Sequence, residues 1–214
     1  MLFEDINALF IHIPKTAGLS IEQNLLSRYN GFNVKSHHTR FIDTPQSVIQ
    51  ENFTFSFVRN PWDRLVSFYH FIGPGAPIYP KRLNVHQWAP YVTRQYIYPR
   101  GNSFRPISFK EFVIHYLDQS HCPHQIKYSL EWDSFDWLAN SDGELDLDYI
   151  GRFSNLTSDF KTLCDKLDID YFPLIKSNES THTKYTDYYD SELRSYVAEK
   201  YYKEIDYFDF KFGD

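Results

Sequence analysis

Residues 14–20, PKTAGLS, combine residue types that suit the binding of a phosphate-like anion. Lys15 offers a compact positive charge, two hydroxyl side chains add donors, and the small residues Ala17 and Gly18 let an anion approach the backbone closely. The order differs from the nucleoside-triphosphatase loop G-x-x-x-x-G-K-S/T. The segment therefore indicates an anion-binding loop, and the alternative interpretation is an ordinary turn with a surface lysine.

A second pair of candidate ligands lies farther along the chain. Arg59 follows the apolar run 53–58, and Ser67 lies eight residues later, about two helical turns away. An arginine fork and a hydroxyl group suit a second, separate phosphate. The alternatives are an ion pair between Arg59 and Asp63, and a Ser67 hydroxyl that faces solvent or bonds back to its own helix.

The position of Arg59 also bears on metal binding. A P-loop triphosphatase places a carboxylate at the end of a neighbouring strand to hold Mg²⁺. Here that position holds an arginine, whose positive charge opposes a metal ion. The two segments therefore predict a multiply anionic ligand bound without a metal.

Strand and helix patterns place these residues at the junctions of a sheet. The apolar runs 8–13 and 53–58 are typical of buried parallel strands, and each precedes a segment with helical spacing, 19–29 and a helix from Pro61 capped by Asn60. Ligands of such folds bind beyond the carboxyl ends of the strands, where helix N-termini offer unpaired N–H groups. The two junctions are therefore expected to share one crevice.

The rest of the chain continues the alternation. Residues 145–150, LDLDYI, predict a strand after a Ser-Asp-Gly turn, and helices are predicted around 109–117, 160–167 and 193–201. Ser108 and Glu111 have the spacing of a capping box. We expect a three-layer α/β fold with a mostly parallel central sheet flanked by helices.

Composition bounds the class of protein. The 214 residues are 42% hydrophobic, which is enough for one substantial core, so we expect a single domain over residues 1–214. The net charge of -6 argues against a nucleic-acid binder with a broad basic surface. No run reaches the ~18 apolar residues of a membrane span. The two cysteines, Cys122 and Cys164, lack metal or redox spacing, which favours reduced thiols and a cytoplasmic protein.

Residues 73–107 break the pattern. This stretch is rich in proline, glycine and tyrosine and has no clear periodicity. We interpret it as an insertion that forms a lid or an acceptor-binding wall, and a disordered surface loop is the alternative.

Two segments together resemble a known family. FIHIPKTAGLS and FSFVRNPWDRLVSFY are similar to the two cofactor motifs of PAPS-dependent sulfotransferases, which use 3′-phosphoadenosine 5′-phosphosulfate (PAPS) as donor. The likeness is to the carbohydrate sulfotransferase branch, also called sulfotransferase family 2, with its heparan 2-O-sulfotransferase-like and bacterial members. It extends to the stretch around His37-His38-Thr39, to YIGRFSNLTSDF and to the C-terminal segment. It implies a P-loop-like sulfotransferase fold.

The resemblance assigns roles to the candidate ligands. Arg59 and Ser67 would hold the 3′-phosphate of PAPS and of its product PAP. The 5′-phosphosulfate would lie on the loop residues Lys15, Thr16, Ala17, Gly18, Leu19 and Ser20. The common family spelling is P-K-T-G-G-T-S, so Ala17 fits easily only if its φ angle is negative, and Leu19 can contribute only through its backbone.

The resemblance also implies a mechanism. Sulfuryl transfer is in line, and charge builds on the bridging oxygen of the leaving nucleotide, where Lys15 would stabilise it. A neutral histidine suits removal of the acceptor proton. His37 matches the family's histidine best, and His38 is the alternative, because neighbours on an extended segment point to opposite sides. His12 is expected to be a packed or hydrogen-bonded core residue, and without a third ligand at useful spacing we predict no metal cofactor.

The acceptor is expected to be a hydroxyl group of a carbohydrate or glycolipid. The basic residues of the insertion are candidates for a wall that binds it, and solvated surface charges are the alternative: Lys81, Arg82, Arg94, Arg100 and Arg105. Two other functions remain open at this stage. One is a P-loop kinase, and the other is a non-catalytic carbohydrate- or nucleotide-binding protein of the same fold.

Overall fold

The computed structural model describes residues 1–72, 108–117, 133–175 and 183–214 of the chain. The predicted insertion at 73–107 lies outside the described residues, as do all five basic residues proposed for an acceptor wall.

Five strands form one sheet in the order β3-β1-β2-β4-β5. β2 pairs with β4, and β4 with β5, in parallel, whereas β1 is antiparallel to both β2 and β3. The α/β fold with a central sheet flanked by helices is present, but the expectation of a mostly parallel sheet is not confirmed, because the sheet is mixed. The strands are β1 (Leu2–Phe3), β2 (Ala8–Ile11), β3 (Gly31–Phe32), β4 (Phe53–Val58) and β5 (Tyr149–Arg152).

The length of the connections explains the mixed pairing. β1 and β2 are joined only by the 3₁₀ turn η1 (Glu4–Ile6) and by Asn7, whose φ of 43° is left-handed. A parallel pair needs a crossover of about a dozen residues, so this short link allows only antiparallel pairing. β2 and β4, in contrast, are separated by two helices and have the length for a parallel crossover.

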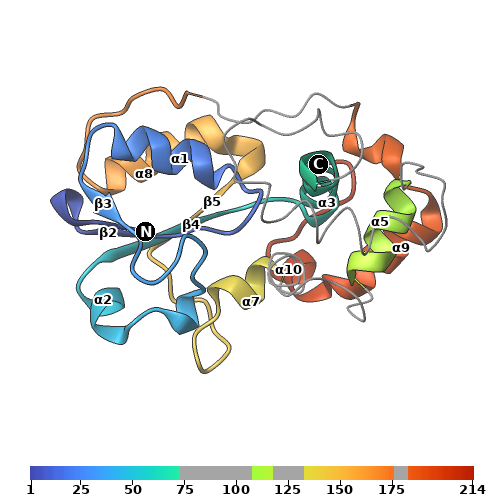
Figure 1. The fold of residues 1–214 in the computed structure, drawn as a ribbon, viewed down its shortest axis with the longest axis horizontal. Helices are drawn as coiled ribbons and strands as arrows, with labels where there is room; N and C mark the ends of the chain where they lie inside the picture. Colours follow the sequence, from blue (N-terminus) through green and yellow to red (C-terminus); the bar gives the residue numbers. More distant parts are fainter. Residues whose placement is uncertain (73–107, 118–132, 176–182) are drawn as a thin grey trace, which may run out of the picture.

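Helices cover both faces of the sheet. In Figure 1, α1 (Gly18–Leu26) and α8 (Leu156–Lys166) lie on one side, and α2 (Gln46–Gln50) and α7 (Ser134–Leu138) lie on the other. Side chains alternate between the two faces along each strand. Phe10 of β2 therefore packs toward α1 and α8, whereas its neighbour Leu9 belongs to the core of the opposite face.

The core on the face of Leu9, called the second core below, continues into a group of helices beyond the strand ends. Trp62 of α3 donates its indole N–H to the Arg194 carbonyl at 3.1 Å and packs edge-on against Phe212, with 5.6 Å between ring centroids. Aromatic side chains thus contribute to packing in this core. The helices are α3 (Pro61–Ile72), α5 (Phe109–Leu117), α9 (Ser191–Lys200) and α10 (Tyr202–Tyr207), and the remaining 3₁₀ turns are η2 (Phe41–Asp43), η3 (Phe153–Asn155) and η4 (Tyr185–Tyr188).

Most predicted elements occur, with one shifted strand. β4 has the predicted bounds, and the capping box closes through the Ser108 N–H to Glu111 Oε2 (2.8 Å) and the Glu111 N–H to Ser108 Oγ (3.2 Å). The strand predicted at 145–150 is instead β5, which starts at Tyr149. Just before it, the Asp148 N–H donates to the Thr54 hydroxyl at 3.2 Å and not to a backbone carbonyl, and the Asp148 carboxylate accepts the Thr54 N–H.

None of the helices in the described parts of the chain combines the length and the apolar character needed to cross a membrane.

Candidate functional site

The loop between β2 and α1 has the backbone form of an anion-binding nest. Lys15 and Ala17 both have φ of 70°, in the left-handed region, and Thr16 between them does not. Alternation of this kind turns successive N–H groups toward one concave point, at the N-terminus of α1. The condition of a negative φ at Ala17 is not met, so the residue carries the strain of an alanine in a glycine-like conformation.

Packing fixes two residues of the loop from behind. Thr16 is fully buried, and its hydroxyl donates to the Ile13 carbonyl at 3.0 Å, so this hydroxyl supports the loop and is not directed at a ligand. A Cβ atom on Gly18 would lie 2.0 Å from Cδ2 of the His12 ring. Gly18 is therefore required by its contact with His12. Ser20 is buried in the first turn of α1, and Leu19 is half-buried.

Lys15 lies in a cationic and partly apolar environment. Its Nζ is 4.2 Å from the centre of the Phe71 ring. Burial, and then the charge of Arg59, lowers the pKa of Lys15 from 10.5 to about 8. An anion in the loop would offset both effects, so the electrostatics of the unliganded loop favour such a ligand.

Arg59 joins the two junctions. It extends from the end of β4, donates to the Lys15 carbonyl at 3.2 Å, and stacks over Phe153 at 3.8 Å. Its Nε and one terminal nitrogen also bind both oxygens of Asp63, at 2.7 and 2.9 Å. The ion pair considered as an alternative is therefore present, and these contacts use three of the five guanidinium N–H groups. Ser67 is buried farther along α3.

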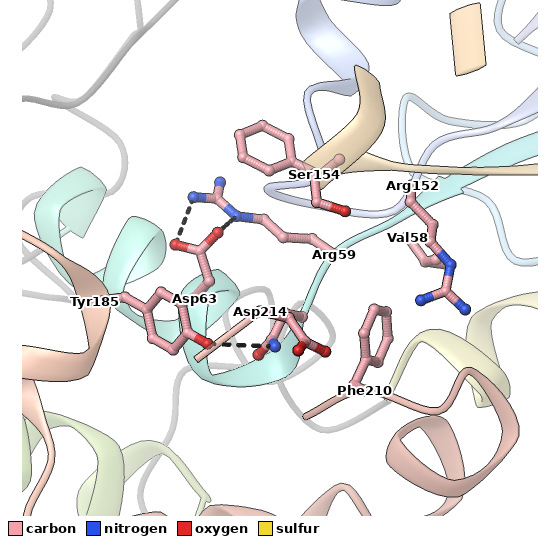
Figure 2. Close-up of a pocket in the computed structure, with 10 residues that line it drawn as sticks. Val58, Arg59, Asp63, Arg152, Ser154, Tyr185, Phe210 and Asp214 are labelled. Carbon is pink, nitrogen blue, oxygen red and sulfur yellow. Dashed lines mark hydrogen bonds and ion pairs between the residues drawn. The ribbon is translucent and has the colours of Figure 1, made fainter. Parts of the chain in front are cut away.

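A cavity of about 180 Å³ opens beside Arg59 at the carboxyl ends of β4 and β5. Figure 2 shows the guanidinium of Arg59 turned to Asp63, and that of Arg152 pointing in another direction. This is the edge of the sheet at which α/β proteins commonly bind ligands. Charged and aromatic side chains line it together, among them Phe153, Ser154, Tyr185, Phe210 and Asp214.

Three histidines gather next to the anion loop. The ring centroids of His12, His37 and His38 are 4.5 to 4.7 Å apart, and the rings meet edge to face. His12 donates from Nδ1 to Oε1 of Glu22 at 3.0 Å, and Nδ1 of His37 lies 3.5 Å from Oε2 of the same carboxylate. Nδ1 of His38 donates to the His12 carbonyl at 3.0 Å, which leaves its Nε2 with a lone pair.

The cluster is electrostatically coupled. Glu22 is only 2% exposed, and burial raises the pKa of its carboxyl, although His37 opposes this rise. Burial, and then His37, lowers the pKa of His12 well below its usual value. Burial followed by His12 lowers the pKa of His38, although part of its side chain is exposed. His12 and His38 are therefore neutral near pH 7.

This grouping differs from the sequence expectation in two respects. His12 is hydrogen-bonded and buried, as expected, but it also contacts both base candidates, and one ring nitrogen from each histidine lies within 4.8 Å of the others. Such a set could hold a metal ion. Sequence reasoning missed Glu22 altogether, although an acid beside Ile21 and Leu25 on the buried side of a predicted helix was a signal.

Comparison with known protein families identifies the family of the chain. A model of the sulfotransferase family, Sulfotransfer_2, matches residues 1–211. No curated protein matches the chain. The family match covers almost the whole sequence and includes the anion loop, the Arg59 junction and the histidine cluster. The chain is a member of the sulfotransferase family.

Proposed function

We propose that this sulfotransferase moves a sulfuryl group from PAPS to a hydroxyl group of a carbohydrate or glycolipid. The observation that supports the proposal most is the contact between Arg59 and the Lys15 carbonyl at 3.2 Å. The contact joins the two strand-to-helix junctions, and the charge of Arg59 lowers the pKa of Lys15, so a donor with two anionic ends would find a cation at each junction.

The donor would bind across the two junctions. Its 5′-phosphosulfate fits the nest at the N-terminus of α1, where N–H groups and Lys15 supply positive potential. Its 3′-phosphate would bind Arg59 and Ser67. Asp63 holds the guanidinium from one side, which keeps the fork in a defined orientation for that phosphate.

The transfer itself needs a cation on one side of sulfur and a base on the other. The acceptor oxygen forms a bond to sulfur, the bond from sulfur to the bridging oxygen breaks, and PAP leaves with the electron pair. Protonated Lys15 would stabilise the charge that builds on that bridging oxygen. The acceptor proton would pass to a histidine nitrogen.

His37 is the proposed base, and His38 is the second candidate. The His37 side chain is 44% exposed, so an acceptor can reach it, while its Nδ1 faces the buried Glu22 carboxylate. A carboxylate in this position orients an imidazole and stabilises the cation that forms when it takes a proton. His38 is instead fixed by a backbone carbonyl.

Thermal unfolding with separate ligands tests the donor assignment. PAP at 100 times its dissociation constant should stabilise the fold by about 2.7 kcal/mol. ATP with Mg²⁺ should stabilise it much less, and Lys15→Ala and Arg59→Ala should both weaken the PAP effect. A larger shift with ATP and Mg²⁺ than with PAP would favour a kinase instead.

Transfer must be tested separately, because a non-catalytic binder would also respond to PAP. Incubation with labelled PAPS and fractionated glycans and lipids should give a labelled product, and His37→Ala should abolish it while PAP binding persists. PAP binding without any labelled product would indicate a binding protein of the same fold.

A further inference from the structure

We propose that His12, His37 and His38 form a binding site for a divalent transition-metal ion such as Zn²⁺. One ring nitrogen from each lies within 4.8 Å of one from each of the others. Three histidine nitrogens with an open fourth position are a common ligand set for zinc. The sequence suggested no third ligand near His37 and His38, and the fold supplies it from the end of β2.

The contacts of the three rings match those of metal-bound histidines. Metal-ligating histidines donate their second ring nitrogen to a carboxylate or a backbone carbonyl, which fixes the ring and directs its lone pair. Here every Nδ1 faces such an acceptor: Glu22 Oε1 at 3.0 Å for His12, Glu22 Oε2 at 3.5 Å for His37, and the His12 carbonyl at 3.0 Å for His38. When Nδ1 carries the proton, Nε2 of each ring keeps the lone pair that a metal ion would use.

The site also meets the requirements of charge and access. Glu22 is 2% exposed and places a carboxylate directly behind two of the ligands, where it would compensate the charge of the ion. His37 is 44% exposed, which opens a path from solvent. Zinc–nitrogen bonds of about 2.1 Å require the three nitrogens to draw closer. His37 and His38 lie outside helices and strands, so the loop can make that adjustment against the fixed His12.

The inference goes beyond the proposed transfer reaction and does not depend on it. A general base needs one histidine nitrogen, whereas this cluster gathers a ring nitrogen from each of three histidines within 4.8 Å. A bound ion would occupy the lone pair that accepts the proton of the acceptor, so the metal-loaded protein should be inhibited. Lys15 and Arg59 are not ligands, and the donor pocket would stay open.

Direct metal binding tests the site. Zn²⁺ is titrated into the full chain, freed of metal beforehand, in competition with a chromogenic chelator, and Co²⁺ is added in parallel to read coordination from its visible spectrum. We expect one equivalent of tightly bound Zn²⁺ and a four-coordinate Co²⁺ spectrum. Glu22→Gln should weaken Zn²⁺ affinity by about 10- to 100-fold, as loss of an outer partner does, and His37→Ala or His38→Ala by at least about 100-fold.

A matched variant and a second ligand complete the test. His70 on α3 binds the Tyr188 hydroxyl at 2.7 Å and is not in the cluster, so His70→Gln should leave Zn²⁺ binding unchanged. The proposal is overturned if His37→Ala and His38→Ala bind Zn²⁺ as the parent chain does, or if Co²⁺ stays six-coordinate. PAP-induced stabilisation of the same variants shows that they are folded, and its absence in the parent would count against the donor assignment alone.

Discussion

The lowered pKa of Lys15 would couple the proposed donor binding to pH. Its pKa of about 8 in the unliganded protein means that it is half neutral at that pH. A bound PAP anion would hold it protonated, so binding must take up a proton where free Lys15 has lost one. PAP affinity should therefore fall about tenfold between pH 7 and pH 9. Calorimetry in two buffers of different ionisation enthalpy measures both the affinity and the proton uptake.

The same shift has a defined effect on the unliganded fold. The folded-state pKa lies below the unfolded value of 10.5, so the unfolded chain binds more protons between about pH 8 and 10.5, and this residue makes stability rise with pH in that window. Lys15→Arg keeps its charge throughout and serves as the control. If its PAP affinity falls with pH as steeply as that of the parent, Lys15 is not the group responsible.

Ala17 offers a second prediction at this scale. Its φ of 70° strains an alanine but not a glycine. Ala17→Gly should therefore raise the free energy of unfolding by about 0.5–1 kcal/mol, measured by denaturant titration. Ala139 has an ordinary φ of -66°, so Ala139→Gly should lower the free energy of unfolding instead. A loss of stability in both variants would contradict the inference that Ala17 is strained.

Single residues also mark where sequence reasoning stopped. Lys15 and Arg59 could be predicted to meet because each follows a strand of one parallel pair, and chain order alone then brings them to one edge of the sheet. The contacts of Glu22 with His12 and His37 could not be predicted, because these partners lie ten or more residues away in either direction. Its role depends on how α1 packs back against the β2 strand, which no local pattern encodes.

At the scale of elements, the start of α1 depends on its contact with His12. A Cβ on Gly18 would come within 2.0 Å of the buried ring, which β2 and Glu22 hold in place. Gly18→Ala should therefore lower the free energy of unfolding by about 1–3 kcal/mol, as overpacking does. The loss should shrink in a His12→Ala background, measured as a double-mutant cycle. An equal loss in both backgrounds would place the strain elsewhere.

A buried ion pair links three helices of the second core. Arg64 of α3 lies 3.5 Å from Glu204 of α10, both are fully buried, and Glu204 also accepts the Ser134 N–H of α7 at 2.5 Å. Arg64→Leu leaves that carboxylate uncompensated and should lower the free energy of unfolding by about 3–5 kcal/mol at pH 8. The double variant Arg64→Leu, Glu204→Leu should recover much of this loss.

The pH dependence of this pair has a defined sign. Burial raises the pKa of Glu204 from 4.5 to about 7, although Arg64 opposes the rise. The folded state binds more protons between those values, so this group's contribution is fully present below pH 4.5 and is lost as pH rises through 7. Arg64→Leu should therefore lower the free energy of unfolding less at pH 5 than at pH 8. Denaturant titrations at pH 5 and pH 8 measure this loss. An equal loss at both pH values would mean that Glu204 does not carry the charge.

The elements themselves were predictable in proportion to their length. β4 matched residue for residue because a strand-forming run with phenylalanine at every second position stands between Asn52 and Arg59, and α1 and α3 followed from helical spacing. β1 and β3 have two residues each, too few for any periodic pattern, so the antiparallel edge of the sheet was not foreseen. β5 was misplaced because the Asp148 carboxylate bonds Thr54, a tertiary contact.

For the molecule as a whole, the fold of the sheet gathers positively charged residues at one place on a chain whose net charge is negative. The net charge is -6, yet Lys15 and Arg59 meet where β2 and β4 end, and the histidine cluster lies at the same end of β2. His12 and Lys15 belong to one connection, three residues apart. The proposed donor and acceptor sites therefore share a single support, which would suit a reaction that must align two groups on opposite sides of one sulfur atom.

This arrangement predicts which segments respond to each part of the nucleotide. The proposed PAP site spans both junctions, so PAP should slow amide hydrogen exchange at 14–20 and at 59–67, measured by mass spectrometry. Adenosine 5′-monophosphate lacks the 3′-phosphate and should protect mainly 14–20, whereas adenosine 3′-monophosphate should protect mainly 59–67. Among the described residues, the hydrogen bonds of α2 reach neither segment, and this helix serves as the internal reference.

The contrast between the two monophosphates carries the test. The phosphate at each end should find its own set of donors, the backbone nest with Lys15 for one and the Arg59 fork with Ser67 for the other. Because Arg59 also donates to the Lys15 carbonyl, a phosphate bound at one segment should slightly slow exchange at the other segment. PAP should therefore protect 14–20 and 59–67 more than the matching monophosphate does. If both monophosphates protected the same single segment, one phosphate pocket would serve both ends, and the two-pocket arrangement would be wrong.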